Sequence, residues 1–294
     1  MADPSPAAPN AHLVQVNAGR DRSVWFDLDD PSDYIQGRIL HTRNFYEIDL
    51  LNEISRLPIG EGVFCDVGAN LGNHTLYFAQ VLGRRVHAFE PLPASVQRLR
   101  RHVELNRLKK RVTVWPFALG ASAGQGRMNP CAGNLGASTL TLLPQSTEPD
   151  RVEVRALDDF WNPAYQVALM KIDVEGHELA VLQGAQKVIA RDQPVLVVET
   201  QQMSDYHAIS GWLYALGYVP FVQRAQTPTI VYVPALHQAA FAQLVPFLIR
   251  QDVGDLRHQL MTMMDRMAAR IKQLEQRVEA LQRLTPPNKA QEAD

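Results

Sequence analysis

The 294-residue sequence has little cysteine, no excess of positive charge and no long hydrophobic run, and each absence argues against a class of protein or partner. Its two cysteines, Cys65 and Cys131, form no CxxC pair, which predicts reduced thiols rather than a disulfide framework or a thiolate metal site. A formal net charge of −2 supplies no basic surface for phosphate backbones, so nucleic acid is not an expected partner. No apolar run reaches the length of a membrane span and the first residues form no signal peptide, so we expect a cytoplasmic protein.

The sequence does contain a regular alternation of short apolar runs and helical patterns. Hydrophobic residues make up 46% of the chain and charged residues 20%, as in a packed globular protein. Because the apolar runs show little alternation, both faces of their sheet are expected to be covered, which is typical of a doubly wound, mostly parallel α/β fold. The predicted strands are 63–67, 85–89, 112–115, 167–172, 195–198, 218–222 and 229–233, the last two as an antiparallel pair, and the main predicted helices are 75–82, 94–106, 178–190 and 210–216.

This pattern predicts one α/β domain with appendages at both ends. A polar insertion rich in glycine, asparagine and serine interrupts the domain at 120–149, and we expect it to select the substrate. In chain order, the predicted parts are a disordered N-terminus (1–12), an extension of short strands and one helix (13–59), the α/β domain (60–250), a coiled coil (253–284) and a disordered tail (285–294).

The predicted C-terminal helix carries a heptad repeat. Apolar residues recur at alternating steps of four and three from Leu260 to Leu281, and β-branched Ile271 and Val278 occupy one of the two core positions. This choice of side chains favours a parallel two-stranded coiled coil, so we expect a homodimer. The alternative is an amphipathic helix that folds back on its own domain.

The strongest signal for a binding site is the turn after the first predicted strand, Asp66-Val67-Gly68-Ala69-Asn70-Leu71-Gly72. Ligands of open α/β sheets lie at the carboxyl ends of the strands, and glycines there let the backbone approach a cofactor closely. A dinucleotide site needs a glycine where this turn has Asn70, and the chain has no P-loop motif. S-adenosylmethionine (SAM) has no phosphate, and an acid such as Asp66 can meet its ammonium and sulfonium charges.

Further acids follow later strands at the same edge of the sheet. Glu90, at the end of the second strand, can accept hydrogen bonds from both ribose hydroxyls of a nucleoside cofactor. Asp173 and Glu175 follow the fourth strand, where carboxylates can orient an acceptor, take its proton or hold a divalent ion, and the need for a metal stays open. Simpler interpretations exist for Glu178, as a helix cap, and for His74, as a locally bonded residue at a helix start.

The ordered set of motifs resembles the FkbM family of methyltransferases. Besides the glycine turn, the resemblance rests on Ala88-Phe89-Glu90-Pro91, Ala118-Leu119-Gly120, Leu157-Asp158-Asp159, Lys171-Ile172-Asp173-Val174-Glu175-Gly176-His177-Glu178 and Val181-Leu182-Gln183-Gly184-Ala185. It implies a class I methyltransferase (Rossmann-like) fold, SAM as methyl donor, and an oxygen acceptor on a sugar or a secondary metabolite. Two alternatives stay open: a nicotinamide-dependent oxidoreductase, and a coiled-coil scaffold with a degenerate α/β domain.

These motifs define the expected site residues. By family position the cofactor site includes Asp66, Gly68, Asn70, Gly72 and Glu90, and the neighbouring Ala69, Asn73, Thr75, Pro91 and Ala118 are added to it. The catalytic candidates are Asp173, Glu175 and His177, with Asp173 expected as the base. The candidates for contact with a small-molecule or glycan acceptor are Asn134, Ser138 and Glu199, and no metal ligand is assigned.

Overall fold

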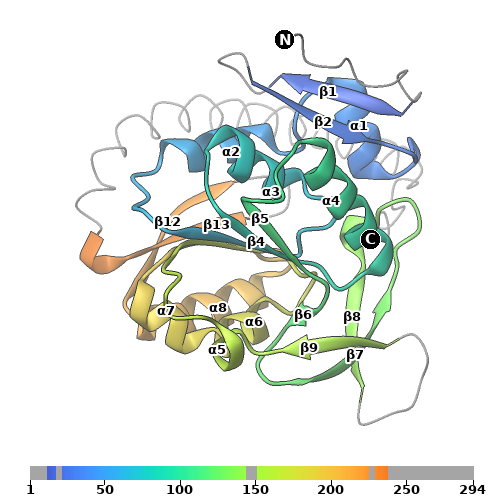
Figure 1. Cartoon of the computed structure of the whole chain (residues 1–294). Coiled ribbons are helices and arrows are strands. Elements are labelled where there is room, and N and C mark those ends of the chain that lie inside the picture. Colours follow the sequence, from blue (N-terminus) through green and yellow to red (C-terminus); the bar gives the residue numbers. More distant parts are fainter. Residues whose placement is uncertain (1–11, 18–21, 144–150, 225–228, 238–294) are drawn as a thin grey trace, which may run out of the picture. The chain divides into compact units, whose positions relative to one another are not determined.

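A seven-stranded sheet forms the centre of the described chain in the computed structural model, which covers residues 12–17, 22–143, 151–224 and 229–237 (Figure 1). The strand order is β12-β13-β11-β10-β3-β4-β5, with β13 antiparallel to both of its neighbours and the other pairs parallel. The predicted antiparallel pair at the end of the domain is therefore confirmed. The strands are β3 (Val63–Val67), β4 (Val86–Phe89), β5 (Val112–Trp115), β10 (Val167–Ile172), β11 (Val195–Glu199), β12 (Tyr218–Arg224) and β13 (Thr229–Pro234).

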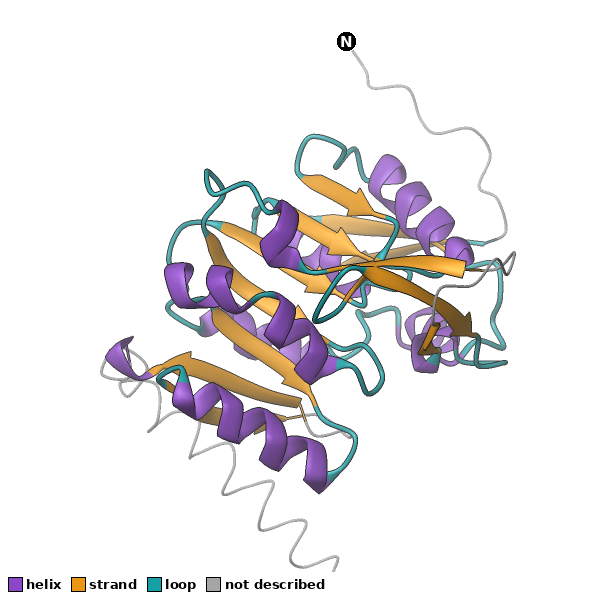
Figure 2. Cartoon of the chain, turned by 90° about the horizontal axis from the view of Figure 1, so that it is seen from below, coloured by secondary structure: helices purple, strands orange, loops and turns teal. Residues whose placement is uncertain are grey.

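Helices cover both faces of this sheet, and the strands lie side by side between them (Figures 1 and 2). Every residue of β3 and of β10 is buried, which explains why their sequences are apolar without alternation, apart from Asp66 and Lys171. One face carries α2 (Ile48–Arg56), α3 (Asn73–Leu76) with a π-helical turn (Tyr77–Val81), and α4 (Pro93–Leu105); the other carries α5 (Leu157–Phe160), α6 (Glu178–Gly184), α7 (Gln186–Asp192) and α8 (Met203–Ala215).

Two predicted helices need correction. The single helix expected over 178–190 is interrupted at Ala185, and α8 begins seven residues earlier than its expected start at Ser210. The interruption follows a tight contact, because a Cβ atom on Gly184 would lie 1.9 Å from the carbonyl oxygen of Gly120. The helical period survives across such a break, so the apolar pattern did not reveal it.

The polar insertion, for which the sequence predicted no strands, contributes two strands to a second sheet. This sheet has four strands in the order β6-β9-β7-β8, and its members are β6 (Ala118–Leu119), β7 (Gly124–Asn129), β8 (Thr139–Leu143) and β9 (Arg151–Arg155). Most side chains of β7 and β8 are at least partly exposed. Backbone pairing rather than apolar burial defines β7, whose sequence shows no alternation of apolar and polar residues. In β8, threonine and leucine alternate, a strand signal that was not used in the prediction.

The N-terminal extension contains a hairpin of β1 (Leu13–Asn17) and β2 (Ser23–Asp27), followed by α1 (Tyr34–Thr42). The alternating residues Val14, Val16, Val24 and Phe26 are all buried, as their period of two predicted. Helix α1 was not predicted. It begins after Asp33, whose carboxylate caps the helix by accepting a hydrogen bond from the N–H of Gln36.

Two polar side chains fix this hairpin to the domain, the buried His102 of α4 and the partly buried Asn106 that ends this helix. Asn106 accepts a hydrogen bond from the N–H of Trp25 and donates one to its carbonyl. His102 is 0% exposed, accepts from the N–H of Asp27 at 2.9 Å and lies 2.7 Å from the carbonyl oxygen of Leu71 through its other ring nitrogen. Burial lowers the pKa of His102, so its neutral ring provides one donor and one acceptor for these two contacts.

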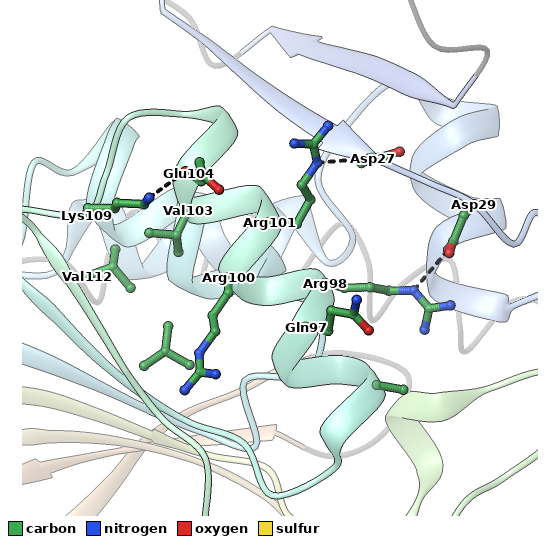
Figure 3. Close-up of a pocket in the computed structure, with 12 residues that line it drawn as sticks. Asp27, Asp29, Gln97, Arg98, Arg100, Arg101, Val103, Glu104, Lys109 and Val112 are labelled. Atoms are coloured by element: carbon green, nitrogen blue, oxygen red, sulfur yellow. Dashed lines mark hydrogen bonds and ion pairs between the residues drawn. The ribbon is translucent and has the colours of Figure 1, made fainter.

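Replacing His102 with leucine is expected to lower the free energy of unfolding by about 2–4 kcal/mol, because two buried backbone groups lose their partner. The control is Arg101→Ala on the same helix. Figure 3 shows Arg98 and Arg101 extending from α4 toward Asp29 and Asp27. Nε of Arg98 lies 2.9 Å from Oδ1 of Asp29, and Nε of Arg101 lies 3.2 Å from Oδ2 of Asp27. The Arg101 side chain is 48% exposed, so its loss should cost less than about 1 kcal/mol. Denaturant unfolding of both variants tests this order, and equal losses would contradict it.

No helix within the described ranges is both long and apolar enough to cross a membrane. The predicted coiled coil over 253–284 and the two predicted disordered ends, 1–12 and 285–294, lie outside the described residues apart from His12. The coiled coil and the homodimer therefore stay predictions.

Candidate functional site

The acid of the glycine turn lies beneath the turn rather than on its surface. Asp66 is 0% exposed, and its Oδ2 accepts a hydrogen bond of 2.5 Å from the Thr75 hydroxyl. Its Oδ1 has no hydrogen-bond partner and lies 3.8 Å from the ammonium of Lys171. The hydrogen bond between Asp66 and Thr75 therefore connects β3 to α3 and stabilises the glycine turn between them.

Gly68 brings the ends of β3 and β10 into direct contact. Its φ is +79°, and a Cβ atom there would lie 1.7 Å from the carbonyl oxygen of Asp173. The N–H of Asp173 in turn donates to the carbonyl of Val67. Only glycine fits this position, because a side chain would force the two strand ends apart.

Glu90 connects the glycine turn to the end of β4. Its two carboxylate oxygens accept hydrogen bonds of 2.8 Å from the N–H groups of Asn70 and Leu92. The side chain is nearly buried, and burial raises its pKa to about 7 although these two bonds and Lys171 act in the opposite direction. Each carboxylate oxygen keeps capacity for a further donor, and the residue lines the adjoining cavity.

This first cavity lies over the ends of β3, β4 and β10 and is closed partly by the second sheet. Met128, Leu135 and Leu140 of the insertion supply an apolar wall next to Glu90. The ring nitrogen Nε2 of His177 lies 2.7 Å from the carbonyl oxygen of Leu140 and so connects the β10–α6 loop to β8. The full lining is Val67, Gly68, Asn70, Phe89, Glu90, Pro91, Ala118, Leu119, Met128, Leu135, Gly136, Ser138, Leu140, Asp173, Val174, Glu175 and His177.

Lys171 supplies a buried positive charge beside this cavity. It is 5% exposed, and its Nζ lies 2.9 Å from Asp173 Oδ2 and 3.8 Å from Asp66 Oδ1. Burial would lower the pKa of Lys171, but the two carboxylates outweigh burial and raise it. Burial alone would raise the pKa of Asp173, but the Lys171 ammonium and a hydrogen bond with Glu199 outweigh burial and lower it.

Asp173, Glu175 and Glu199 form a cluster whose carboxylate oxygens lie within 4.8 Å of one another. Burial, the hydrogen bond with Asp173 and the charge of Asp173 raise the pKa of Glu199 far above its usual range, so Glu199 carries the shared proton. A divalent ion fits this arrangement poorly, since the Lys171 ammonium lies 2.9 Å from Asp173 and already balances its charge. We therefore derive no step through a metal.

Glu175 faces both cavities from a strained loop. Its φ is +55°, and burial together with the charges of Asp173 and Glu178 raises its pKa to about 7. Gln201 donates a hydrogen bond to Glu175. Glu178 is 2% exposed and accepts from the N–H groups of Val174 and Gly176, which precede α6. It therefore stabilises the loop before the helix, and the expected helix cap is wrong, because α6 has no side-chain cap hydrogen bond.

A second cavity adjoins the first and shares five residues with it, Gly68, Asn70, Gly136, Asp173 and Glu175. Residues of the N-terminal extension close one side of this second cavity. Asn73 holds the extension there, because its side chain accepts a hydrogen bond from the N–H of Tyr46 and donates one to the Tyr46 carbonyl. The remaining lining residues are Tyr34, Ile35, Tyr46, Glu47, Ala69, Leu71, Asn73, His74, Asn134, Lys171 and Glu199.

Most of the residues expected from the sequence line one of these two cavities. The exceptions are Asp66, Gly72 and Thr75, which support the turn from below or begin its helix. Ser138 lines the first cavity, but its hydroxyl donates to the carbonyl of Leu135. The remaining expected residues comprise Gly68, Ala69, Asn70, Asn73, Glu90, Pro91, Ala118, Asn134, Asp173, Glu175, His177 and Glu199.

Two groups of lining residues were missed. Lys171 carried a signal, because a lysine within the six-residue apolar strand β10 must find a buried partner. Tyr34, Tyr46 and Glu47 carried none, because they belong to a segment far from the motifs in sequence.

A family described as the methyltransferase FkbM domain matches residues 66–220, more than half of the 294 residues. The chain belongs to the FkbM methyltransferase family. Its sheet is mixed, mostly parallel and seven-stranded, which confirms the class I methyltransferase fold that the sequence predicted. Membership decides against the nicotinamide-dependent oxidoreductase that the sequence left open.

Several known proteins are similar to this FkbM-family chain. Methyltransferase 1 of Beauveria bassiana (strain ARSEF 2860) is 26% identical over 195 residues, which cover 59% of this chain and 76% of the relative. The crystal structure of an FkbM methyltransferase from Methylobacillus flagellatus KT has a TM-score of 0.45 and 21% identity, and the match covers 70% of this chain but only 55% of that one. A Streptococcus pneumoniae protein described as a tRNA methyltransferase, solved with S-adenosyl-L-methionine, has a TM-score of 0.41 and 14% identity, over 63% of this chain and 70% of that one.

Proposed function

We propose that this FkbM-family protein transfers the methyl group of SAM to a hydroxyl oxygen of a small-molecule or glycan acceptor. Glu90 carries the proposal. It is a nearly buried carboxylate with spare acceptor capacity, and it lines a cavity beside a turn in which Gly68 has no room for a side chain.

The residues of the first cavity fit this donor. Glu90 would accept from the ribose hydroxyls, Ala118 and Leu119 would contact the adenine, and the turn from Gly68 would receive the methionine part. The Nδ2 atom of Asn70 is buried without a hydrogen-bond partner, as expected of a donor that awaits a ligand. When bound, SAM supplies a methyl group that its positive sulfur has already activated.

An alcohol acceptor must lose a proton, and Glu175 is the best-suited base in this proposal. Asp173, the base expected from the sequence, is engaged by Lys171 and Glu199, which lower its pKa and weaken it as a base. Glu175 lines both cavities, and its pKa of about 7 suits proton transfer near neutral pH. His177, whose ring nitrogen contacts Leu140, would hold the wall of the cavity in position.

The test is calorimetric titration of the full chain with SAM, S-adenosylhomocysteine and NAD. We expect saturable binding of both adenosyl ligands and none of NAD, followed by methyl transfer to some member of a panel of sugar hydroxyl compounds. Binding of neither adenosyl ligand would refute the proposal, whereas transfer to nitrogen acceptors alone would refute its oxygen specificity.

A further inference from the structure

The second cavity carries an excess of negative charge. Its lining contains four carboxyl groups, of Glu47, Asp173, Glu175 and Glu199, against the single ammonium of Lys171. That ammonium is already engaged with Asp173 and Asp66. Crowded carboxylates that receive no further cation retain protons, and the raised pKa values of Glu175 and Glu199 agree with this.

His74 indicates independently that a ligand belongs in this cavity. The residue is 6% exposed and lines the cavity, yet its buried Nε2 atom makes no hydrogen bond. The nearest charged oxygen is Oε2 of Glu47, at 3.4 Å. A buried ring nitrogen without a hydrogen-bond partner costs free energy, and this cost is removed when a ligand group bonds to it.

Two aromatic rings complete the wall near Glu47. Tyr34 and Tyr46 pack edge to face with centroids 6.0 Å apart, and Tyr34 is 43% exposed. Besides burial, the charges of Glu47 and Glu199 raise the pKa of the Tyr46 hydroxyl, so this ring lies within the field of the same acids. Aromatic faces beside carboxylates attract organic cations.

We propose that the second cavity recognises an acceptor that bears an ammonium group near the hydroxyl to be methylated. Glu47 provides the countercharge together with Glu199, whose carboxyl releases its proton to solvent when the cation binds. His74 Nε2 accepts an N–H bond, and Tyr34 and Tyr46 flank the cation. This inference rests on the proposed function and assigns the acceptor class: an amino alcohol or amino sugar rather than an acidic or phosphorylated compound, which the four carboxyls would repel.

The experiment titrates the full chain, saturated with S-adenosylhomocysteine, with glucosamine, galactosamine and 2-amino-1,3-propanediol, each paired with its N-acetyl derivative. Acetylation keeps the ring or chain hydroxyls and removes the charge. At least one amine is expected to bind about tenfold tighter than its neutral partner. Absence of binding by all three amines, or equal binding by both members of every pair, would overturn the proposal.

Two variants and a control locate the effect. Glu47→Gln and Glu199→Gln should each weaken the amine about five- to tenfold and leave the N-acetyl partner unchanged. Glu104→Gln, on the exposed face of α4, should change neither. If Glu47→Gln and Glu199→Gln weaken binding of SAM but not of S-adenosylhomocysteine, the cation that these acids meet is the sulfonium of SAM. If the protein binds Mn²⁺ saturably and Glu199→Gln abolishes this binding, the cavity holds a metal ion. Either result overturns the proposal. Failure of S-adenosylhomocysteine to bind refutes the proposed function separately.

Discussion

Replacing Glu90 with glutamine is expected to weaken SAM binding about 100-fold, because the ribose hydroxyls lose a charged acceptor. The glutamine keeps the shape of the side chain but carries an NH₂ group on one side. That group would face the N–H of Asn70 or of Leu92, so one of the present hydrogen bonds becomes a contact between two donors. Calorimetric titration with SAM measures the change, with Glu153→Gln, an exposed residue of β9, as the matched control.

The same carboxyl predicts how SAM affinity depends on pH. Because burial raises the pKa of Glu90 to about 7 in the free protein, the group is partly protonated at neutral pH. Ribose hydroxyls donate to the carboxylate form, so binding releases a proton, and affinity should rise with pH up to about 7 and then level off. The rise should be absent from Glu90→Gln, and an identical slope in both proteins would exclude Glu90 as its source.

Replacing Glu175 with glutamine is expected to lower kcat about 10²–10⁴-fold while SAM affinity stays close to that of the unchanged protein, because an amide cannot take the acceptor proton. In the unchanged protein, kcat should rise with pH and level off above about 7, since only the ionised carboxylate of Glu175 acts as a base. Burial and the charges of Asp173 and Glu178 raise the pKa of Glu175, whereas the hydrogen bond from Gln201 and the charge of Lys171 lower it.

The measurement is methyl transfer at saturating SAM and acceptor, across pH, with Glu104→Gln as the control. Saturating SAM removes the contribution of Glu90, so the two pH effects separate. If Glu175→Gln keeps both its rate and its pH profile, the base is another group, and Asp173→Asn becomes the variant to compare.

Local sequence patterns predicted the central sheet, the glycine turn at the end of β3 and the carboxylate at the end of β4. Continuous apolar runs predicted all seven strands of that sheet. The glycines after β3 and the acid after β4 were assigned to the cofactor site, and in the structure Glu90 accepts from the N–H of Asn70 in the glycine turn. These features are local, since each strand and the turn after it are encoded by about ten adjacent residues.

The pattern failed where burial does not determine the local structure. The strands β7 and β8 have mostly exposed or half-exposed side chains, and neither was predicted from the sequence. The break at Ala185 depends on how closely Gly184 approaches Gly120, a contact between segments far apart in the chain. Neither β7 nor the break at Ala185 leaves a periodic signal in its own segment.

The sequence by itself therefore determined the fold class, the glycine turn and the carboxylate at the end of β4. Only the tertiary structure decided which side chains complete the second cavity, in which Tyr46 and Glu47 meet His74, Lys171 and Glu199. It also decided which carboxyl is ionised, because Lys171 lies 2.9 Å from Asp173. The physical reason is that apolar burial repeats along a strand, whereas the charge balance of a cavity depends on distances between residues that are remote in sequence.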